Sequence, residues 1–372
     1  MDFSLSEERK MLQETVARFF ENNYKDIKKR SDYLALNDGF SREIWKESAD
    51  LGVISGLISP TFGGLGGTGE DFSIIFELIG KSLCIEPFLS SGILSSTILS
   101  SIRNPKTELI NQIIDGELLI SFAHMEMNNR YEDHFVETKA FLEDDNWKLN
   151  GSKSFVINGD SADKVIVSAR IDGEINDKNG IGLFLVDNNH ITRRSYNTID
   201  GYKAAELNFD NVNAELLCKD DLALECIIKS NSAGALALSA EAVGIMQICF
   251  DLTLEYLKTR KQFGKSIGAF QSIQHRMVDM MLEIEQVRSA VMLASSTFET
   301  NSSTRDKNVS AAKNLVGRVG KLIAEESIQL HGGIAMTWEY SVAHYAKRLI
   351  MIDHLMGDED YHRDRFKMLS SI

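Results

Sequence analysis

The order of apolar and polar residues divides the chain into three stretches. Up to about residue 118, apolar residues such as Leu12, Val16 and Phe19 recur at helical spacing. From there to about residue 212, short β-rich runs such as "KVIVSAR" and "IGLFLVD" are bounded by Gly, Asn and Asp. Beyond residue 220 the pattern is helical again, with long periodic segments at 235–259 and 271–298.

These patterns predict an α+β fold that is mostly α. We expect an N-terminal helical domain over residues 1–118, a small central β-barrel or sandwich domain over 119–216, and a C-terminal four-helix bundle over 217–372. Within the central stretch, "LNGSKSFVINGDSADK" contains two Asn-Gly dipeptides beside β-type residues, which predicts a hairpin.

Composition and charge narrow the classes of partner. The net charge of −14 argues against nucleic acid, whose phosphates would be repelled, but allows a small anionic ligand in a local basic pocket. The N-terminus lacks the apolar core of a signal peptide, and no uncharged apolar run is long enough for a bilayer. We expect a cytoplasmic protein without a membrane partner. Its cysteines form no C-x-x-C pair and are expected to be free and buried: Cys84, Cys218, Cys226 and Cys249.

One segment combines cationic, amide and aromatic residues around glycines: "RKQFGKSIGAFQ", residues 260–271. The guanidinium of Arg260 is suited to a phosphate, and the ring of Phe263 to stacking on a flat group. Gln262 and Gln271 offer amide hydrogen bonds, so the set suits a nucleotide cofactor. A plain corner between two helices explains the spacing equally well.

A second segment, "ESIQLHGGIAMTWEY" at 326–340, places Gln329 and His331 just before Gly332 and Gly333. The glycine pair is typical of a helix end or of a close approach to backbone, and a plain helix end is the simpler interpretation. We find no metal-ligand spacing, no G-x-S-x-G elbow and no G-x-G-x-x-G fingerprint after a strand. The charged segment at 357–367 is most simply a solvated end.

Taken together, these segments resemble the acyl-CoA dehydrogenase family over essentially the whole chain. The residues that carry the resemblance are "TRKQFGKSIGAFQ", "QLHGG", "EYSVAHYAKRLIMID" and the helical–β–helical order. Within the family, "RYEDHF", "NGDSADKVIVSAR" and "HYAKRLIMIDHLMGDEDYH" look closest to the small subunit of pimeloyl-CoA dehydrogenase.

The resemblance implies an FAD enzyme that oxidises acyl-CoA to trans-2-enoyl-CoA and passes electrons to an electron-transfer flavoprotein. A carboxylate base removes the α-proton as hydride leaves the β-carbon for the flavin. It also implies which residues contact the pyrophosphate and adenine of FAD, across a dimer interface: Arg260, Gln262, Phe263, Gln271, Gln329, Gly332 and Gly333.

Other positions depart from the family pattern. The Glu-Pro-Gly-Ala-Gly-Ser-Asp segment that lines the flavin is here "EMNNRYED", which keeps Glu126 but loses the Pro-Gly turn. Phe155 and Ile157 replace a Trp and a Thr beside the flavin. The usual base aligns with Met356, and the alternative base position of some members aligns with Gly234. Neither residue can accept a proton, so the catalytic residue is unknown.

Three hypotheses follow. The chain is a subunit of a heteromer that completes the FAD site of a catalytic sister subunit. Alternatively, it is a self-sufficient homo-oligomer with Glu241 as base, although a structural carboxylate at a helix crossing is the preferred interpretation of Glu241. The third is a flavin-dependent oxidase or monooxygenase on the same fold. The acyl chain length is not determined by the sequence.

Overall fold

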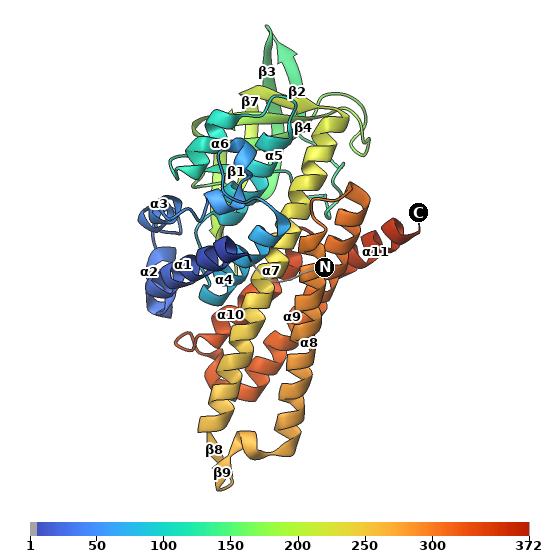
Figure 1. Ribbon diagram of the computed structural model, residues 1–372. Coiled ribbons are helices and arrows are strands. Elements are labelled where there is room, and N and C mark those ends of the chain that lie inside the picture. Colours follow the sequence, from blue (N-terminus) through green and yellow to red (C-terminus); the bar gives the residue numbers. More distant parts are fainter. Residues whose placement is uncertain (1–5, 372) are drawn as a thin grey trace. The chain divides into compact units, whose positions relative to one another are not determined.

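The computed structural model describes residues 6–371, and the chain folds into two compact units. One comprises the chain up to Ser31, Thr68–Cys84 and Ala235–Ile372; the other comprises Asp32–Gly67 and Ile85–Gly234. The element order confirms the predicted succession of helices, strands and helices (Figure 1). The predicted boundaries at 118 and 216 stay a prediction.

The helices are α1 (Glu7–Tyr24), α2 (Ile27–Leu34), α3 (Arg42–Asp50), α4 (Gly69–Ser82), α5 (Ser96–Ser101), α6 (Thr107–Ile114), α7 (Asp221–Thr259), α8 (Gln271–Ser296), α9 (Ser302–His331), α10 (Val342–His354) and α11 (Glu359–Ser370). Short helical turns cover Ser55–Leu57, Pro60–Phe62, Asn188–His190, Ile267–Ala269 and Gly332–Met336, and a π-helix covers Phe88–Ser95. The strands are β1 (Ile120–Ala123), β2 (Lys139–Glu143), β3 (Asn146–Ile157), β4 (Lys164–Arg170), β5 (Ile181–Asp187), β6 (Thr192–Asn197), β7 (Lys203–Lys219), β8 (Lys261–Gln262) and β9 (Lys265–Ser266).

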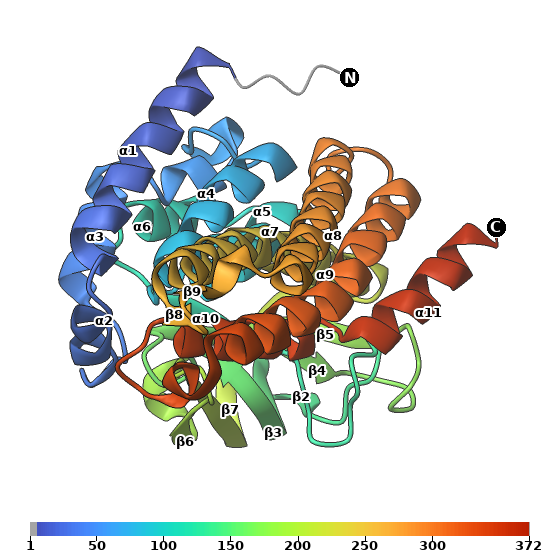
Figure 2. The same cartoon turned by 90° about the horizontal axis from the view of Figure 1, so that it is seen from below.

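Seven strands form one sheet, and Figure 2 labels six of them, β2 to β7. Its order is β1-β4-β2-β3-β7-β5, and the additional pairing of β4 with β5 completes a ring, while β6 extends the sheet from β7. Alternate residues of these strands, such as Leu149, Val167 and Phe184, point into a common apolar core. The predicted small β-barrel is therefore present.

The predicted hairpin at the two Asn-Gly dipeptides is wrong. Strand β3 runs through Asn150 and Gly151 without turning, and it pairs with β2 and β7 rather than with β4. Gly151 has φ +140° and lies at a bulge in the β3–β7 ladder, where an added Cβ would come within 2.8 Å of the Thr138 backbone. The turn between β2 and β3 is instead Asp144–Asp145, where both residues have positive φ.

Local signals fix several helix starts. Thr68 and Asp71 form a capping box at the start of α4, as each side chain bonds to the backbone N–H of the other. The side chain of Ser6 accepts the Arg9 N–H at the start of α1. All four cysteines are free and buried, as predicted.

Helix α7 is the most apolar long helix of the described chain. By length and composition it passes the test for a membrane span, but 83% of its most apolar window is buried inside the structure. Burial of this kind is expected of a core helix. Most of the apolar surface of α7 is therefore buried against other residues of the chain.

Two glycines bring helices α4 and α7 into close contact. A Cβ at Gly80 would lie 2.0 Å from the Glu241 carbonyl oxygen, and one at Gly244 would lie 2.0 Å from the Glu77 carbonyl oxygen. Only residues without a side chain allow the backbones to approach so closely.

Beside this crossing, a buried ion pair joins α7 to α10. The two carboxylate oxygens of Glu241 accept hydrogen bonds from the Arg348 Nε at 2.6 Å and Nη2 at 2.9 Å. The side chains of Glu241 and Arg348 are 1% and 5% exposed. The preferred interpretation of Glu241, a structural carboxylate at a helix crossing, matches this geometry.

We predict that Arg348→Met destabilises the protein by about 3–5 kcal/mol, because it leaves the Glu241 carboxylate buried without a partner. The double variant Glu241→Leu/Arg348→Met should recover much of that loss, since it removes both charges. Urea denaturation measures the free energy of unfolding. Arg318→Met, which breaks an exposed ion pair with Glu283, is the control and should cost less than about 1 kcal/mol. An equal loss in the single and double variants would contradict this account.

A second prediction concerns the barrel core. Burial, with the nearby charge of Lys153, lowers the pKa of His124 from 6.5 to about 3. The folded state therefore holds His124 neutral, whereas the unfolded state binds a proton below pH 6.5. Stability from this group is present in full above pH 6.5 and is lost as the pH falls toward 3, by about 2 kcal/mol at pH 5.

In His124→Gln, the fall in unfolding free energy between pH 7 and pH 5 should shrink by about this amount. The exposed His275→Gln is the matched control and should leave the pH dependence unchanged. A His124→Gln curve parallel to that of the parent protein would refute the assignment.

Candidate functional site

The segment between α7 and α8 is a small hairpin rather than a plain helix corner. Strands β8 and β9 pair through Lys261 with Ser266 and through Gln262 with Lys265. Phe263 and Gly264 form the turn with φ +54° and +82°, so both are in the left-handed region of a two-residue hairpin turn. Figure 1 shows this hairpin at the end of the bundle where α7 and α8 meet.

Phe263 occupies an unfavourable position in the isolated chain. Its side chain is 88% exposed, and its positive φ is uncommon for a bulky residue. The nearby Phe270 ring lies edge-on at 6.2 Å, and the Lys265 ammonium lies 4.2 Å above that second ring. A strained and exposed aromatic residue suggests a role in contact with another molecule.

The second predicted segment lies at the end of α9. Gly332 has φ +69° and ψ −148°, a backbone conformation that is essentially restricted to glycine. Within the described residues, no atom lies within 4 Å of a Cβ built on Gly332 or Gly333. The backbone at these two residues is therefore open to a ligand that approaches closely.

The structure brings the two segments to the same end of one helical unit. Tyr256, one turn before Arg260, stacks on His331 with ring centroids 4.7 Å apart. The side chains of Arg260, Gln262, Gln271 and Gln329 are all exposed. A guanidinium, three amides, an exposed aromatic ring and an open glycine pair fit the pyrophosphate and adenine of FAD, and their role as FAD contacts remains a prediction.

The two predicted base positions carry no proton acceptor. Met356 and Gly357 form a turn between α10 and α11 with φ +55° and +102°. Gly234 lies within α7, three residues after Asn231, whose amide donates to the Asp133 carboxylate at 2.7 Å. One position therefore has the thioether of Met356 and the other has only the backbone of Gly234, and neither has a carboxylate.

Two buried side chains hold the Met356 turn through its backbone. The Lys313 ammonium donates to the carbonyl oxygens of Ile352 at 2.8 Å, Asp353 at 3.1 Å and Gly357 at 2.8 Å. The His362 Nε2 donates to the Met356 carbonyl at 2.8 Å. Burial lowers the pKa of Lys313 to about 8, so the ammonium is mostly charged at neutral pH.

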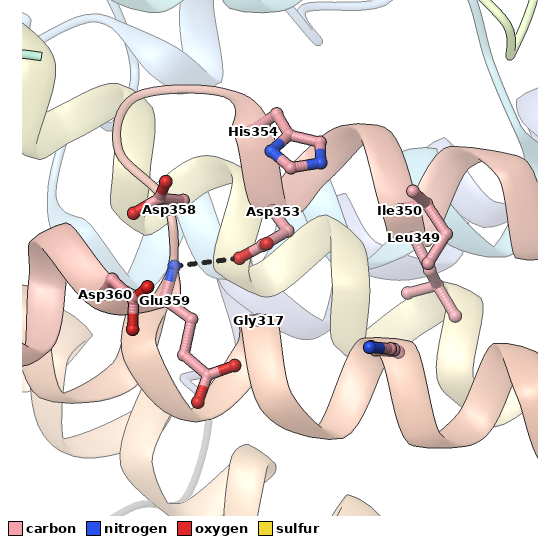
Figure 3. Close-up of a pocket in the computed structure, with 9 residues that line it drawn as sticks. Gly317, Leu349, Ile350, Asp353, His354, Asp358, Glu359 and Asp360 are labelled. Carbon is pink, nitrogen blue, oxygen red and sulfur yellow. Dashed lines mark hydrogen bonds between the residues drawn. The ribbon is translucent and has the colours of Figure 1, made fainter. Parts of the chain in front are cut away.

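The carboxylates that lie nearest to the Met356 turn in the sequence line a pocket (Figure 3). Its volume is about 400 Å³, and Asp353, Asp358, Glu359 and Asp360 contribute to its wall. The Asp353 carboxylate accepts the Glu359 backbone N–H at 3.1 Å. An acidic pocket of this kind is unsuited to an anionic CoA thioester.

The chain end that contains these acids is more ordered than the sequence suggested. Residues 359–370 form helix α11, which packs on α9, and His362 is buried. Arg365 also pairs with Asp306 of α9. The interpretation of residues 357–367 as a solvated end is therefore wrong, because one side of this helix is apolar or paired.

Glu126, the residue retained from the family's flavin-lining segment, has hydrogen-bond and ion-pair partners for both carboxylate oxygens within the barrel unit. Its carboxylate accepts the Thr138 N–H at 3.0 Å, the Thr138 hydroxyl at 2.7 Å and the Glu137 N–H, and it pairs with the buried Lys153 ammonium. Burial opposes its ionisation, but Lys153 and the N–H donors outweigh burial and lower the pKa of Glu126. Glu126 thus fastens both ends of the loop 126–138.

Sequence reasoning missed the positioning residues. Lys153, Lys313 and Arg348 are buried cations whose partners lie 27, 39–44 and 107 residues away. No short motif marks such pairs. Phe155, which replaces the family Trp, lies at a bulge with φ +50° and 6.4 Å from the Tyr196 ring.

Comparison with known proteins places this chain in a family. Models of the acyl-CoA dehydrogenase N-terminal, middle and C-terminal domains match residues 6–104, 121–212 and 225–368. The chain is 28% identical over 355 residues to the probable acyl-CoA dehydrogenase YngJ of Bacillus subtilis, with 92% of each chain covered. It is 28% identical over 355 residues to the acyl-CoA dehydrogenase IpdE2 of Mycolicibacterium smegmatis, with 95% and 96% covered.

Solved structures share the fold. The ChsE4–ChsE5 complex from Mycobacterium tuberculosis superposes with a TM-score of 0.87 at 20% identity, covering 100% of this chain and 99% of that one. The FAD complex of PigA superposes with a TM-score of 0.90 at 23% identity, covering 100% and 99%. From the three domain matches together, this chain belongs to the acyl-CoA dehydrogenase family of FAD-dependent oxidoreductases.

Proposed function

We propose that this chain is the subunit of a heteromeric acyl-CoA dehydrogenase that completes the FAD site of a catalytic sister subunit. The observation that carries the proposal is an asymmetry within the chain. The residues expected to contact FAD are exposed and open, whereas the base positions hold Met356 and Gly234. Bound FAD would accept the hydride from the acyl β-carbon, and the sister subunit would supply the carboxylate that removes the α-proton.

In this role the chain binds and orients rather than transfers protons. Arg260 would grip the pyrophosphate, and Gln262 and Gln271 would hydrogen-bond to the polar edges of the adenosine half. The open backbone at Gly332 and Gly333 would allow the cofactor to approach closely, and Phe263 would cover an apolar surface of the cofactor or of the partner.

Helix α8 supports an assembly of at least two chains. Its inward face is buried and includes Met280, Ile284, Val287 and Val291. Its outward face carries polar residues such as Glu285 and Ser289, but it also carries large apolar residues that are 37–57% exposed: Val278, Met281, Leu282, Met292 and Leu293. Gln271 lies on that outward face, since it precedes Val278 by two helical turns. A helix with large apolar residues on its exposed face as well as on its buried face is suited to contact with a second chain.

The substrate and the electron acceptor follow from the resemblance alone. We propose an acyl-CoA substrate, such as the medium-chain dicarboxylyl thioester pimeloyl-CoA, and an electron-transfer flavoprotein as acceptor, in the cytoplasm. Two structural relatives, the ChsE4–ChsE5 complex and the Tcur3481–Tcur3483 protein, each join two differently named chains, which agrees with a heteromer.

The self-sufficient alternative finds less support. Glu241, the carboxylate that it requires as base, has both oxygens bonded to Arg348 and is buried. A base needs a free lone pair within reach of the substrate proton. A flavin oxidase or monooxygenase remains an outcome of the experiment below rather than a second proposal.

We predict that the purified chain with added FAD does not oxidise acyl-CoA. Co-expression with a family member that keeps the base carboxylate should give a complex with one FAD per heterodimer and full turnover with an electron-transfer flavoprotein. Flavin absorbance against protein concentration gives the stoichiometry. Turnover by the chain alone would refute the proposal, and one FAD per chain would count against it. A flavin peroxide in stopped-flow spectra would favour a monooxygenase.

We further predict that Arg260→Ala in the assembled complex weakens FAD binding about 10–100-fold, since a charge-assisted hydrogen bond contributes about 1.5–3 kcal/mol. Arg260→Lys should recover only part of the affinity, because an ammonium lacks the planar fork. Lys258→Ala removes an exposed cation from the same end of α7 and is the matched control. Equal FAD affinity in Arg260→Ala and Lys258→Ala would remove Arg260 from the site.

A further inference from the structure

We propose that His331, held between Tyr256 and Tyr340, is a positioning residue that fixes the two FAD-contact segments relative to each other. The inference rests on the proposed function for the role of those segments, but the geometry of the stack is independent of it. The His331 ring is stacked on Tyr256 at 4.7 Å with an interplanar angle of 29°, and lies 5.0 Å from the Tyr340 ring at 59°.

Each ring of this stack belongs to a different stretch of chain. Tyr256 is in the last turn of α7, and its carbonyl accepts the Arg260 N–H at 2.8 Å. His331 is the last residue of α9 and directly precedes Gly332. Tyr340 closes the loop that begins at the glycine pair. The imidazole directly before the glycine turn therefore contacts Tyr256, at the base of the hairpin, and Tyr340, at the end of the loop that follows.

The glycine pair itself contributes no side-chain packing to the position of this turn. A Cβ built on Gly332 or Gly333 would meet no atom of the described chain within 4 Å beyond their sequence neighbours. The neighbouring Ile334 and Met336 are exposed. The buried side chains that flank the glycine pair are therefore His331 directly before it and Ala335 two residues after it.

The stack requires a neutral and oriented imidazole. The Nδ1–H donates to the Ser327 carbonyl at 2.8 Å, one turn earlier in α9, which fixes the ring relative to its own helix. His331 is 3% exposed, and burial lowers its pKa although neighbouring carbonyl groups raise it. The ring is thus uncharged at neutral pH and is suited to lie between two phenol rings.

The test uses the full chain and amide hydrogen exchange. His331→Leu removes the ring and should raise exchange at least tenfold in two separate segments, residues 256–262 and 332–341, while α8 and the barrel strands stay unchanged. His331→Phe keeps a ring and should restore most of the protection. Trp338→Leu removes an exposed aromatic residue of the same loop and is the matched control, with no change at 256–262.

The second measurement is the FAD dissociation constant of the assembled complex. His331→Leu should raise it about tenfold, and His331→Phe should restore it to within about threefold of the parent value. Unchanged exchange at 256–262 in His331→Leu would overturn the inference, as would general loosening of the whole bundle. Local loosening with unchanged FAD affinity would also overturn it. If the purified chain alone oxidises acyl-CoA, the proposed function fails instead, whatever the exchange shows.

Discussion

The helical unit depends on a buried ion pair. Glu241 and Arg348 neutralise each other where α7 meets α10, and the glycines Gly80 and Gly244 allow α4 to approach α7 at the same level. Because a buried charge is tolerated only with a partner, neither residue is free for other work. The pairing that compensates these two buried charges thus also occupies the carboxylate that the self-sufficient hypothesis required as base.

The remaining features divide between the segments proposed to contact FAD and two base positions without a proton acceptor. Phe263 keeps a positive φ that is uncommon for a bulky residue, and Gly332 keeps a conformation that is essentially restricted to glycine. The Met356 turn and the Gly234 position keep their backbone but present no proton acceptor. An isolated enzyme would need both sets of features in one chain. The exposed apolar residues of α8 are what a chain would carry if the second set came from a neighbour.

The sequence predicted the features that depend on local patterns. Helical periodicity located α7 and α8, and the β-rich runs located β4 and β5. The sequence did not predict the features that depend on contacts between residues far apart along the chain. In the sequence alone, Gly151 resembles a hairpin glycine. In the structure, Thr138 on another segment occupies the space that a Cβ at Gly151 would need. The hydrogen bonds from Lys313 to the Met356 turn and from Thr138 to Glu126 join residues that no local motif connects. For residues 260–271 the local pattern left a nucleotide site and a helix corner equally open, and for Gln329, Gly332 and Gly333 it favoured a plain helix end; the family resemblance is what favoured cofactor contacts at both.

The Met356 turn is anchored entirely through its main chain. The Lys313 ammonium donates to the carbonyl oxygens of Ile352, Asp353 and Gly357, and the His362 ring donates to that of Met356. None of these hydrogen bonds depends on which side chain occupies position 356. Structure and reactivity are therefore separable at this point of the fold. A lineage can exchange the residue here without disturbing the turn, which gives a physical route by which a duplicated subunit loses its chemistry while keeping its shape and its ability to assemble.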